Sequence, residues 1–310
     1  MTVGARPVRA VLADLARQLG SAGEARWLVE HVSGAGPGAL VLARQGAELP
    51  GDALAALHEL TRRRLAGEPL QYLLGSWPFR GVQLRVDPRV LIPRPETEVV
   101  AGYALDELDR AAADAPAACP GEPLVVADLG TGSGAIALAL ATEGPERIDR
   151  PLQVWATDAS PAALEVAGAN EEAVRRSAAR MAPVHLAAGS WFDALPGSLA
   201  GRLAMVVSNP PYVSDPEWAG LDATVRDHEP RQALVGGPVG TEQIDRLLIE
   251  APRWLVRWGA LVLEVAPHQA DGAARAAMVR GFDAVMVRSD LAGRQRVLVA
   301  RCPAPQDAPR

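Results

Sequence analysis

The chain has 310 residues, of which 49% are hydrophobic and 22% charged, with a formal net charge of −6. This composition is typical of a globular protein of one large domain or two ordinary ones. The negative net charge argues against a protein that binds nucleic acid over its whole surface. Because no apolar run is long enough to span a membrane, and Asp14 and Arg17 interrupt any signal-peptide pattern, a cytoplasmic protein without a membrane segment is expected.

Cysteine and lysine usage narrows the classes further. Cys119 and Cys302 are the only cysteines, so neither a disulfide framework nor a zinc site is indicated, and no metal is expected. All 31 residues counted as Lys or Arg are arginines. Without lysine the chain lacks a residue that a phosphate-binding P-loop needs.

Residues 1–69 predict a bundle of three or four short amphipathic helices. Apolar residues recur at helical spacing, and Gly20 suits the end of the first helix. Ser21 and Glu24 form a capping-box pattern for the second helix, and Asp52 is predicted to cap a third. We therefore expect a small N-terminal helical domain, whose sequence alone indicates no chemistry.

Residues 70–95 alternate apolar and polar side chains, which predicts a hairpin-like connector. A helix then begins with Pro95 in its first turn, and Glu96 and Glu98 lie at its positively polarised end. Residues 111–123 are rich in alanine and proline and indicate a loop.

From residue 124 onward, predicted strands alternate with predicted helices. The expected strands are 124–130, 152–158, 183–189, 203–209, 260–266, 283–290 and 294–302, and the expected helices include 134–143, 161–178 and 241–258. Such alternation implies a mostly parallel sheet covered by helices on both faces. We therefore predict an α/β domain over residues 96–310.

The segment DLGTGSG, residues 128–134, joins the first strand of this domain to its helix. Gly130, Gly132 and Gly134 allow a sharp turn and the close approach of a ligand, and the helix N-terminus favours an anion. The spacing differs from the G-x-G-x-x-G of dinucleotide-binding folds, so the loop alone is weak evidence.

Asp158 ends the second strand, where an acid can bind ribose hydroxyls. The alternative is that Asp158 only caps the helix that starts near Pro161. Together with the glycine-rich turn, Asp158 favours a ligand that carries adenosine. S-adenosylmethionine fits, because its carboxylate can meet the turn and its ribose can meet Asp158.

The sequence Asn-Pro-Pro-Tyr, residues 209–212, ends the fourth strand. Because strand carboxyl ends line the ligand crevice of such sheets, Asn209 is expected to face the same cleft as the glycine-rich turn. The alternative is a merely stiff turn in a chain that contains 26 prolines. That alternative explains neither the asparagine nor the aromatic residue.

Methyl transfer to a planar NH2 group explains both residues, since the nitrogen lone pair is delocalised and the group must be held in a reactive geometry. The side-chain oxygen of Asn209 and the carbonyl of Pro210 supply two acceptors, the Pro211 ring helps to fix them, and Tyr212 can stack on the planar group. Asn209, Pro210 and Tyr212 are therefore the predicted catalytic residues. The scheme requires no strong general base.

These features resemble the class I methyltransferases that modify planar nitrogens, and six segments are similar to the HemK/PrmC family. The segments are EPLQYLLGSWPFRG (68–81), VLIPRPETE (90–98), ADLGTGSGAIALALA (127–141), GSWFDAL (189–195), SNPPYV (208–213) and EPRQALVGGPVG (229–240). The resemblance runs over about residues 65–270 and implies a Rossmann-like, seven-stranded, mostly parallel sheet. It also implies methylation of the glutamine side-chain amide in the Gly-Gly-Gln motif of class 1 peptide chain release factors.

The resemblance assigns site residues by position. Those expected at S-adenosylmethionine are Asp128, Gly130, Thr131, Gly132, Ser133, Gly134, Asp158, Trp191 and Asn209, and those at the glutamine are Asn209, Pro210, Pro211 and Tyr212. Trp191 would flank the adenine, unless it is an ordinary core or rim aromatic. Arg94 and Glu96 are interpreted as salt-bridged packing. The sequence EVAPHQ (264–269), and His228 before Glu229, depart from the usual family pattern.

Residues 1–69 would serve as a substrate-recognition domain, and a monomer that does not contact nucleic acid directly is expected. Within the same chemistry, a ribosomal-protein glutamine is the second candidate substrate. An adenine amine of nucleic acid is a further alternative, against which the acidic charge and the N-terminal helices argue. A binding protein that has lost catalysis would not need the intact glycine loop, Asp158 and Asn-Pro-Pro-Tyr corner.

Overall fold

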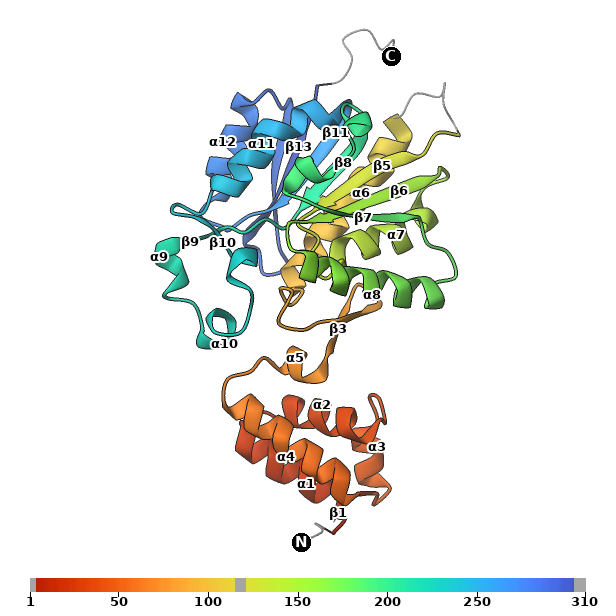
Figure 1. Cartoon of the computed structure of the whole chain (residues 1–310), viewed down its shortest axis with the longest axis vertical. Coiled ribbons are helices and arrows are strands. Elements are labelled where there is room, and N and C mark those ends of the chain that lie inside the picture. Colours follow the sequence, from red (N-terminus) through yellow and green to blue (C-terminus); the bar gives the residue numbers. More distant parts are fainter. Residues whose placement is uncertain (1–3, 115–120, 304–310) are drawn as a thin grey trace. The chain divides into compact units, whose positions relative to one another are not determined.

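Figure 1 shows the protein as a computed structural model, which describes residues 4–114 and 121–303. The chain divides into two compact units. The helical unit comprises the chain up to Ser76 together with Asp222–His228, and the sheet unit comprises Trp77–Leu221 and the chain from Glu229 onward. The proposed domain division at residues 69 and 95 stays a prediction.

The helical unit is built from short helices around one apolar core. Its elements are β1 (Arg6–Pro7), α1 (Val8–Leu19), α2 (Ala22–Ser33), α3 (Ala39–Arg44), β2 (Glu48–Leu49), α4 (Gly51–Leu65), α5 (Leu70–Leu74) and α10 (Ala223–Arg226). β1 pairs antiparallel with β2. The buried core consists of Val8, Val11, Leu15, Ala25, Leu28, Val29, Ala39, Leu49, Leu57 and Leu70.

Helix ends in this unit follow the expected chemistry in two of three cases. The helix α1 ends at Gly20, which has a left-handed backbone with φ of 68°, and Ser21 caps α2 by accepting from the Glu24 N–H at 3.2 Å. The other half of the predicted capping box is not formed, because the Glu24 carboxylate pairs with Arg64 at 2.7 Å. The prediction for Asp52 is wrong, because α4 already begins at Gly51 after Pro50. Asp52 lies in the first turn instead, where its carboxylate still faces the positive helix end.

The predicted connector contains one helix and one hairpin. Leu70, Leu73 and Leu74 recur at helical spacing, so α5 forms before Gly75, where the backbone turns left-handed. The strands β3 (Ser76–Phe79) and β4 (Val82–Arg85) then form a two-stranded sheet. Their two-residue turn, Arg80–Gly81, has positive φ at both positions, as a tight hairpin requires.

The sheet unit contains one seven-stranded sheet with the order β12-β13-β11-β8-β5-β6-β7 (Figure 1). The strands are β5 (Leu124–Leu129), β6 (Leu152–Asp158), β7 (Val184–Ala188), β8 (Leu203–Ser208), β11 (Leu255–Glu264), β12 (Ala284–Ser289) and β13 (Gln295–Arg301). Only β13 runs antiparallel to its neighbours, β11 and β12. The prediction of a mostly parallel, seven-stranded sheet is confirmed.

Helices cover both faces of this sheet, as predicted. One apolar cluster joins alternate β5 residues to α6 (Pro95–Asp114), α7 (Ala135–Arg147) and α8 (Pro161–Ser177). The other joins the intervening β5 residues to α11 (Glu242–Trp254) and α12 (Ala270–Val279).

Short elements connect these strands and helices. Between β8 and α11 lie β9 (Val213–Ser214), α9 (Asp215–Trp218), a 3₁₀ turn (Arg231–Ala233) and β10 (Val235–Gly237). Two further 3₁₀ turns span Trp191–Ala194 and Gly197–Leu199.

Several element boundaries differ from the sequence prediction, among them the end of α7, at Arg147 rather than 143, and the start of β11, at Leu255 rather than 260. The helix α11 ends at Trp254 rather than at residue 258, because Leu255 already has an extended backbone and starts β11. The helix α6 continues to Asp114, into the segment predicted to be a loop. Over the described part of the chain, no helix combines the length and hydropathy needed to cross a bilayer.

Candidate active site

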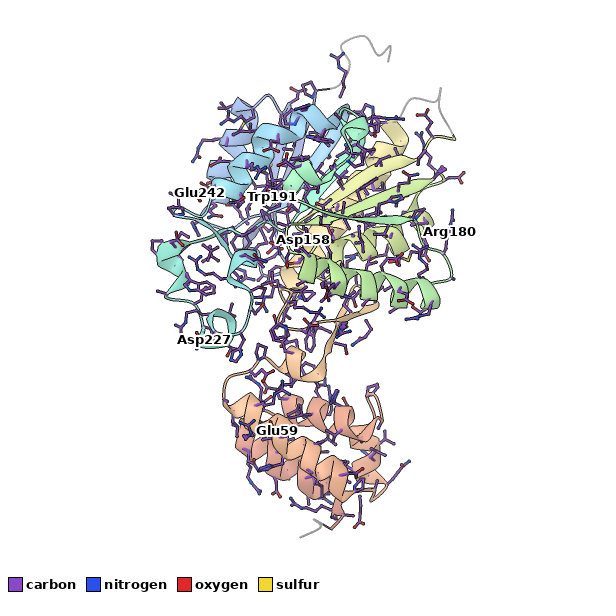
Figure 2. All side chains as sticks on the ribbon, viewed as in Figure 1. Glu59, Asp158, Arg180, Trp191, Asp227 and Glu242 are labelled. Atoms are coloured by element: carbon purple, nitrogen blue, oxygen red, sulfur yellow. The ribbon has the colours of Figure 1, made fainter. Side chains whose placement is uncertain are left out.

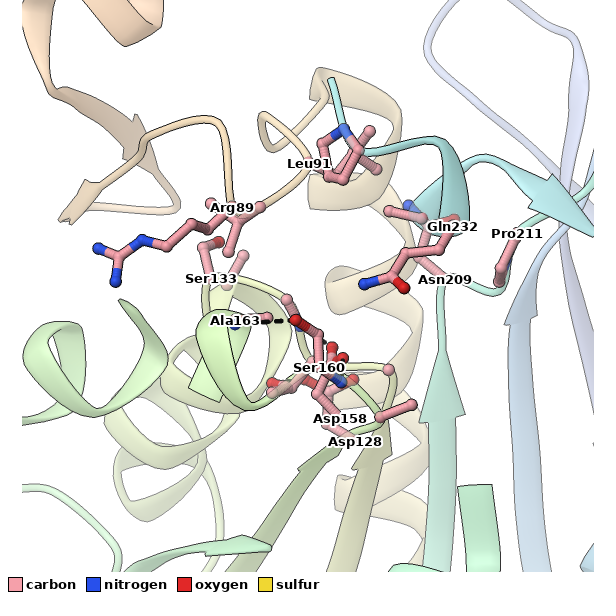
Figure 3. A pocket seen from close by; sticks show the side chains of 18 of the residues that line it. Arg89, Leu91, Asp128, Ser133, Asp158, Ser160, Ala163, Asn209, Pro211 and Gln232 are labelled. Carbon is pink, nitrogen blue, oxygen red and sulfur yellow. Dashed lines mark hydrogen bonds between the residues drawn. The ribbon is translucent and has the colours of Figure 1, made fainter. Parts of the chain in front are cut away.

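A cavity of about 430 Å³ opens at the carboxyl ends of the central strands of the sheet unit (Figure 3). Its lining includes residues that follow β5, β6, β7 and β8, together with the segments around Val90 and Gln232. The chain passes from β5 to β6 on one side and later returns to β8 on the other side of β5. Ligands of doubly wound sheets bind at such a reversal of strand order.

The glycine-rich loop forms part of the wall of this cavity. Gly130, Gly132 and Gly134 all have left-handed backbones, with φ of 74°, 56° and 86°. The N–H groups of Gly130 and Thr131 donate to the Thr157 carbonyl at 2.9 and 2.8 Å. Since these donors are used inside the protein, the loop shapes the cavity more than it offers free donors.

Asp158 ties the glycine-rich loop to the next strand end. Its two oxygens accept from the Gly132 N–H at 2.9 Å and from the Ser160 N–H at 2.8 Å. The cap of α8 is Ser160, whose hydroxyl accepts from the Ala163 N–H at 3.2 Å (Figure 3). Asp158 is therefore not merely a helix cap, and burial raises the pKa of its carboxyl.

Asp128 places a second, fully buried carboxylate in the cavity wall. One oxygen accepts from the Thr131 hydroxyl at 2.6 Å and from the Ala137 N–H at 3.0 Å. The other oxygen, Oδ1, is buried and has no hydrogen-bond partner among the described residues. Burial raises the pKa of Asp128 to about 7. An unpaired acceptor beside a second carboxylate suits a ligand that carries positive charge.

S-adenosylmethionine is such a ligand, since it carries an ammonium and a sulfonium group next to an adenosine. The two carboxylates, Asp128 and Asp158, and the glycine-shaped wall fit its charge and its bulk. The side chains of Asp128 and Asp158 lie together in Figure 3, while Asn209, Pro211 and Gln232 lie on another side of the same cavity. The residues present therefore fit the expected cofactor.

Trp191 is held firmly at the cavity rim. It lines the cavity, as Asp158 does, and both are labelled in Figure 2. Its indole N–H donates to the Gln243 side-chain oxygen at 3.0 Å, and its backbone has an unusual positive φ of 52°. A Cβ atom on Gly130 would lie only 3.3 Å from its ring. Packing against an adenine remains a prediction for Trp191.

The Asn-Pro-Pro-Tyr corner directly follows the fully buried strand β8. Asn209 and Pro211 line the cavity, whereas Pro210 and Tyr212 are not among its lining residues. The Tyr212 hydroxyl donates to Glu264 at 3.1 Å, and burial raises the pKa of this phenol. The Tyr212 ring packs against the apolar core, and its predicted stacking on a substrate amide stays a prediction.

Three residues that the sequence reasoning missed hold this corner in place. Thr97 accepts from the Asn209 amide at 3.2 Å and donates to Glu264 at 2.7 Å. Gln269 donates its side-chain N–H to the Tyr212 carbonyl at 2.9 Å. Glu264 and Gln269 are the two ends of the segment EVAPHQ, whose departure from the usual family pattern lies between them. A polar residue at a buried strand end was the only available signal for Glu264.

Ion pairs join residues next in sequence to some that line the cavity, such as Pro93 and Pro230. Glu229 is almost fully buried, pairs with Arg94, and accepts from the Ile92 N–H at 3.1 Å. Glu96 pairs with Arg294 at 2.7 Å. The interpretation of Arg94 and Glu96 as salt-bridged packing is confirmed.

The described residues contain one free thiol and no cluster of metal ligands. Among residues 4–114 and 121–303, no three His, Cys, Asp or Glu side chains are grouped to hold a metal ion. Cys302 is a half-buried free thiol, and burial raises its pKa to about 11. Cys119 lies outside the described residues.

Comparison with known proteins agrees with this geometry. Residues 10–75 match the family model of the PrmC N-terminal domain, and residues 104–223 match that of the methyltransferase small domain. The chain is 40% identical over 288 residues to the release factor glutamine methyltransferase of Gloeobacter violaceus, with 90% of each chain covered. It is 39% identical over 278 residues to that of Deinococcus radiodurans, again with 90% of each chain covered.

Among solved structures, the release factor-specific protein-(glutamine-N5) methyltransferase of Alicyclobacillus acidocaldarius is 27% identical. That alignment covers 71% of this chain and 100% of the other, with a TM-score of 0.39. The curated relatives match both the helical and the sheet units at close to 40% identity. The chain therefore belongs to the PrmC family of release factor glutamine methyltransferases.

Proposed function

We propose that this enzyme methylates the side-chain amide nitrogen of the glutamine in the Gly-Gly-Gln motif of class 1 peptide chain release factors. The curated relatives are named for glutamine methylation of release factors. The chain itself supplies a cavity with one buried carboxylate, Asp128, one partly buried carboxylate, Asp158, and an asparagine amide on another side. Methyl transfer to an amide nitrogen needs a place for the methyl donor and a group that orients the acceptor, and these residues supply both.

The cofactor in this proposal is S-adenosylmethionine. Asp128 and Asp158 would face its positively charged and hydroxyl-bearing parts, and Trp191 would pack beside its adenine. When bound, it supplies an electrophilic methyl carbon on sulfur, and S-adenosylhomocysteine is the product. Of the remaining residues of the proposed cofactor site, Gly130–Ser133 and Asn209 line the cavity, and Gly134 does not.

Asn209 and Pro210 orient the glutamine amide. A carboxamide nitrogen is a poor nucleophile, because its lone pair is delocalised into the carbonyl group. Two acceptors, the Asn209 side-chain oxygen and the Pro210 carbonyl, would hold its two N–H groups in the geometry that favours attack. Pro211 limits the motion of the corner because its ring locks a backbone dihedral angle. Tyr212 completes the predicted glutamine site.

A strong general base is not part of this proposal. The amide nitrogen becomes acidic once it carries a methyl group, so water can take the departing proton. Tyr212 is a poor candidate base, since burial raises the pKa of its hydroxyl and that hydroxyl donates to Glu264. The chain therefore contributes position and hydrogen-bond acceptors rather than proton abstraction.

The observation that carries the proposal is the position of Asn209. It follows β8 directly and lines the same cavity as Asp128 and Asp158. An amide acceptor at that place can contact the cofactor and a second ligand in the same cavity. It is suited to holding a second, planar, hydrogen-bonding group.

Labelled S-adenosylmethionine tests the proposed function. Purified enzyme is incubated with a release factor, with the same release factor after the Gly-Gly-Gln glutamine is replaced, with ribosomal protein, and with nucleic acid. Label is expected only in the release factor that keeps its Gly-Gly-Gln glutamine. Equal labelling of both release factors, or labelling only of ribosomal protein or nucleic acid, would refute the proposal.

A further inference from the structure

Three segments far apart in the chain meet in one buried hydrogen-bond network behind the Asn-Pro-Pro-Tyr corner. Glu264, at the end of β11, is 1% exposed and accepts from the Thr97 hydroxyl at 2.7 Å and the Tyr212 hydroxyl at 3.1 Å. Thr97, in the first turn of α6, accepts from the Asn209 side-chain N–H at 3.2 Å. One carboxylate thus holds two residues of the corner, one directly and one through a hydroxyl.

The network has a direction that follows from its donors and acceptors. Burial raises the pKa of Glu264, so the direction holds for its ionised form. An ionised carboxylate only accepts hydrogen bonds, so the single hydroxyl proton of Thr97 is then given to Glu264. The Thr97 oxygen then has only lone pairs to offer. The end of the Asn209 amide that faces the Thr97 oxygen must therefore be the NH2 group. If the amide oxygen faced Thr97 instead, two acceptor oxygens would meet with no proton between them.

The other end of the Asn209 amide is left for a ligand. No donor among the described residues is bonded to its Oδ1 atom, and Asn209 lines the cavity. A rotated amide would present its NH2 group to the cavity instead. That group cannot accept a hydrogen bond from a substrate amide nitrogen.

We propose that Glu264 and Thr97 are positioning residues, which turn the Asn209 amide so that its oxygen faces the glutamine to be methylated. The proposal rests on the proposed function for its substrate. It goes further in naming two residues that act on the reaction through Asn209: Thr97, which also lines the cavity, and Glu264, which is not among the lining residues. Glu264 also fixes the Tyr212 ring through its second oxygen.

A purely structural role for the network makes different predictions. Buried polar groups are ordinarily paired, so loss of the Thr97 hydroxyl would in that case lower stability and leave kcat unchanged. A positioning role lowers kcat while the affinity for S-adenosylhomocysteine is kept. Kinetics and the state of the Asn209 amide therefore distinguish the two roles.

Thr97→Val tests the proposal, because it keeps the side-chain shape and removes the hydroxyl. We expect kcat for release factor methylation to fall by about ten- to hundredfold, with the Kd of S-adenosylhomocysteine within about twofold of the wild-type value. Thr97→Ser should restore most of the lost kcat. Thr142→Val is the matched control, since the Thr142 hydroxyl donates to backbone carbonyls within α7.

Glu264→Gln is the second variant. This substitution keeps the side-chain shape but replaces one acceptor oxygen with an NH2 donor, so either Thr97 or Tyr212 loses its acceptor. Where the NH2 group faces Thr97, the hydroxyl proton is released to Asn209 and the rotated amide is favoured. A lower kcat is expected here as well, with cofactor affinity again preserved.

A second readout needs no substrate. The side-chain ¹⁵N–¹H signals of Asn209, identified by their loss in Asn209→Ala, should shift in Thr97→Val and remain close to wild type in Thr97→Ser. A wild-type kcat together with unshifted Asn209 signals in Thr97→Val would overturn the proposal. So would equal losses of kcat in the valine and serine variants.

The two readouts also separate this proposal from the proposed function. If the wild-type enzyme fails to label any release factor, the proposed function is refuted. The amide signals still decide whether Thr97 sets the orientation of Asn209.

Discussion

Asn209 is the single residue on which the proposed reaction depends most. Its amide lines the cavity and is anchored only through its nitrogen among the residues that the structure describes. Removal of one preorganised hydrogen-bonding group from an active site costs about 10²–10³ in kcat. We therefore expect Asn209→Ala to lower kcat by at least about a hundredfold.

Cofactor binding should survive this substitution, because Asp128, Asp158 and Trp191 remain in place. Calorimetric titration with S-adenosylhomocysteine is the measurement, with turnover assayed on the same preparation. Near-normal turnover in Asn209→Ala would refute the role given to the amide. A complete loss of binding would place Asn209 in the cofactor site alone.

Asp128 predicts a pH dependence of folding stability. Burial raises its pKa to about 7 from the usual 3.8. Because the folded state holds this proton more tightly than the unfolded state, the stabilising contribution is complete below the unfolded pKa and is lost as the pH rises through about 7. At higher pH the protein bears the cost of a buried charge.

Asp128→Asn removes this titration. Relative to the wild type, the free energy of unfolding of the variant should rise as the pH increases from about 4 to about 7, by about 1.4 kcal/mol for each unit of pKa shift, and then stay level. Denaturant unfolding of the cofactor-free proteins at several pH values measures this difference. A difference that does not change with pH would show that Asp128 is ionised throughout.

At the residue scale, the sequence predicted the ends of individual strands well. Gly130 and Asp158 lie on one cavity because strand carboxyl ends always share one edge of a parallel sheet. The Thr97–Glu264 hydrogen bond could not be predicted in this way, since it joins a helix start to a strand end 167 positions away. Such a contact depends on how α6 packs, and side-chain periodicity carries no information about that.

At the scale of elements, β10 is packed against the catalytic corner. A Cβ atom on Gly236 would lie 2.5 Å from the Pro211 carbonyl oxygen, and one on Gly240 would lie 2.6 Å from the Tyr212 carbonyl oxygen. These neighbours are backbone atoms, so they cannot move without moving the corner. This explains physically why the segment VGGPVG contains its glycines.

Gly236→Ala is therefore expected to displace the corner. Gly236 does not need a positive φ, so the effect of the extra methyl group is purely spatial. We expect a loss of about 1–3 kcal/mol in the free energy of unfolding and a kcat lowered by about ten- to hundredfold. Thermal unfolding and methylation assays on the same variant measure both quantities.

Gly272→Ala is the matched control for this substitution. Gly272 lies on the exposed side of α12, and an added Cβ would meet no atom within 4 Å. Kinetics should be unchanged there, and helix propensity predicts a slight gain in stability. Equal kinetics for the two alanine variants would show that the corner tolerates the added methyl group.

Element boundaries were predictable where a local signal exists. Gly20 and Ser21 mark helix ends through backbone geometry and capping, and the structure agrees with both. The end of α11 at Trp254 was missed, because the apolar residues after it suit a helix as well as a buried strand. Only pairing of β11 with β8 decides between them, and that pairing is not local.

At the scale of the whole molecule, the mostly parallel arrangement of the sheet was predictable from the sequence. Which residues belong to which of the two units was not. Alternating strands and helices imply a parallel sheet, and the resemblance to a family implied seven strands. Nothing in the local pattern indicates that Asp222–His228 belongs to the helical unit rather than to the sheet unit around it. That assignment depends on contacts between distant residues, such as the approach of His228 to Gly67.

Each unit has its own apolar core. The cluster around Val8 and Leu28 contains only residues of the helical unit. The two clusters around β5 contain only residues of the sheet unit. Units with separate cores are expected to unfold separately. Calorimetry of the full chain should therefore show two transitions. The proposed cofactor site lies entirely in the sheet unit, so S-adenosylhomocysteine should stabilise only that unit.

At a free concentration of about 100 times its Kd, the product adds about 2.7 kcal/mol to the stability of the state that binds it. For a unit of this size that corresponds to a rise of about 5–10 °C in one transition, while the transition of the helical unit should move by less than about 1 °C. Scans with adenosine at the same concentration control for non-specific effects. A single transition that moves as a whole would show that the two units unfold cooperatively, and an unchanged scan would show that the cavity does not bind the cofactor product.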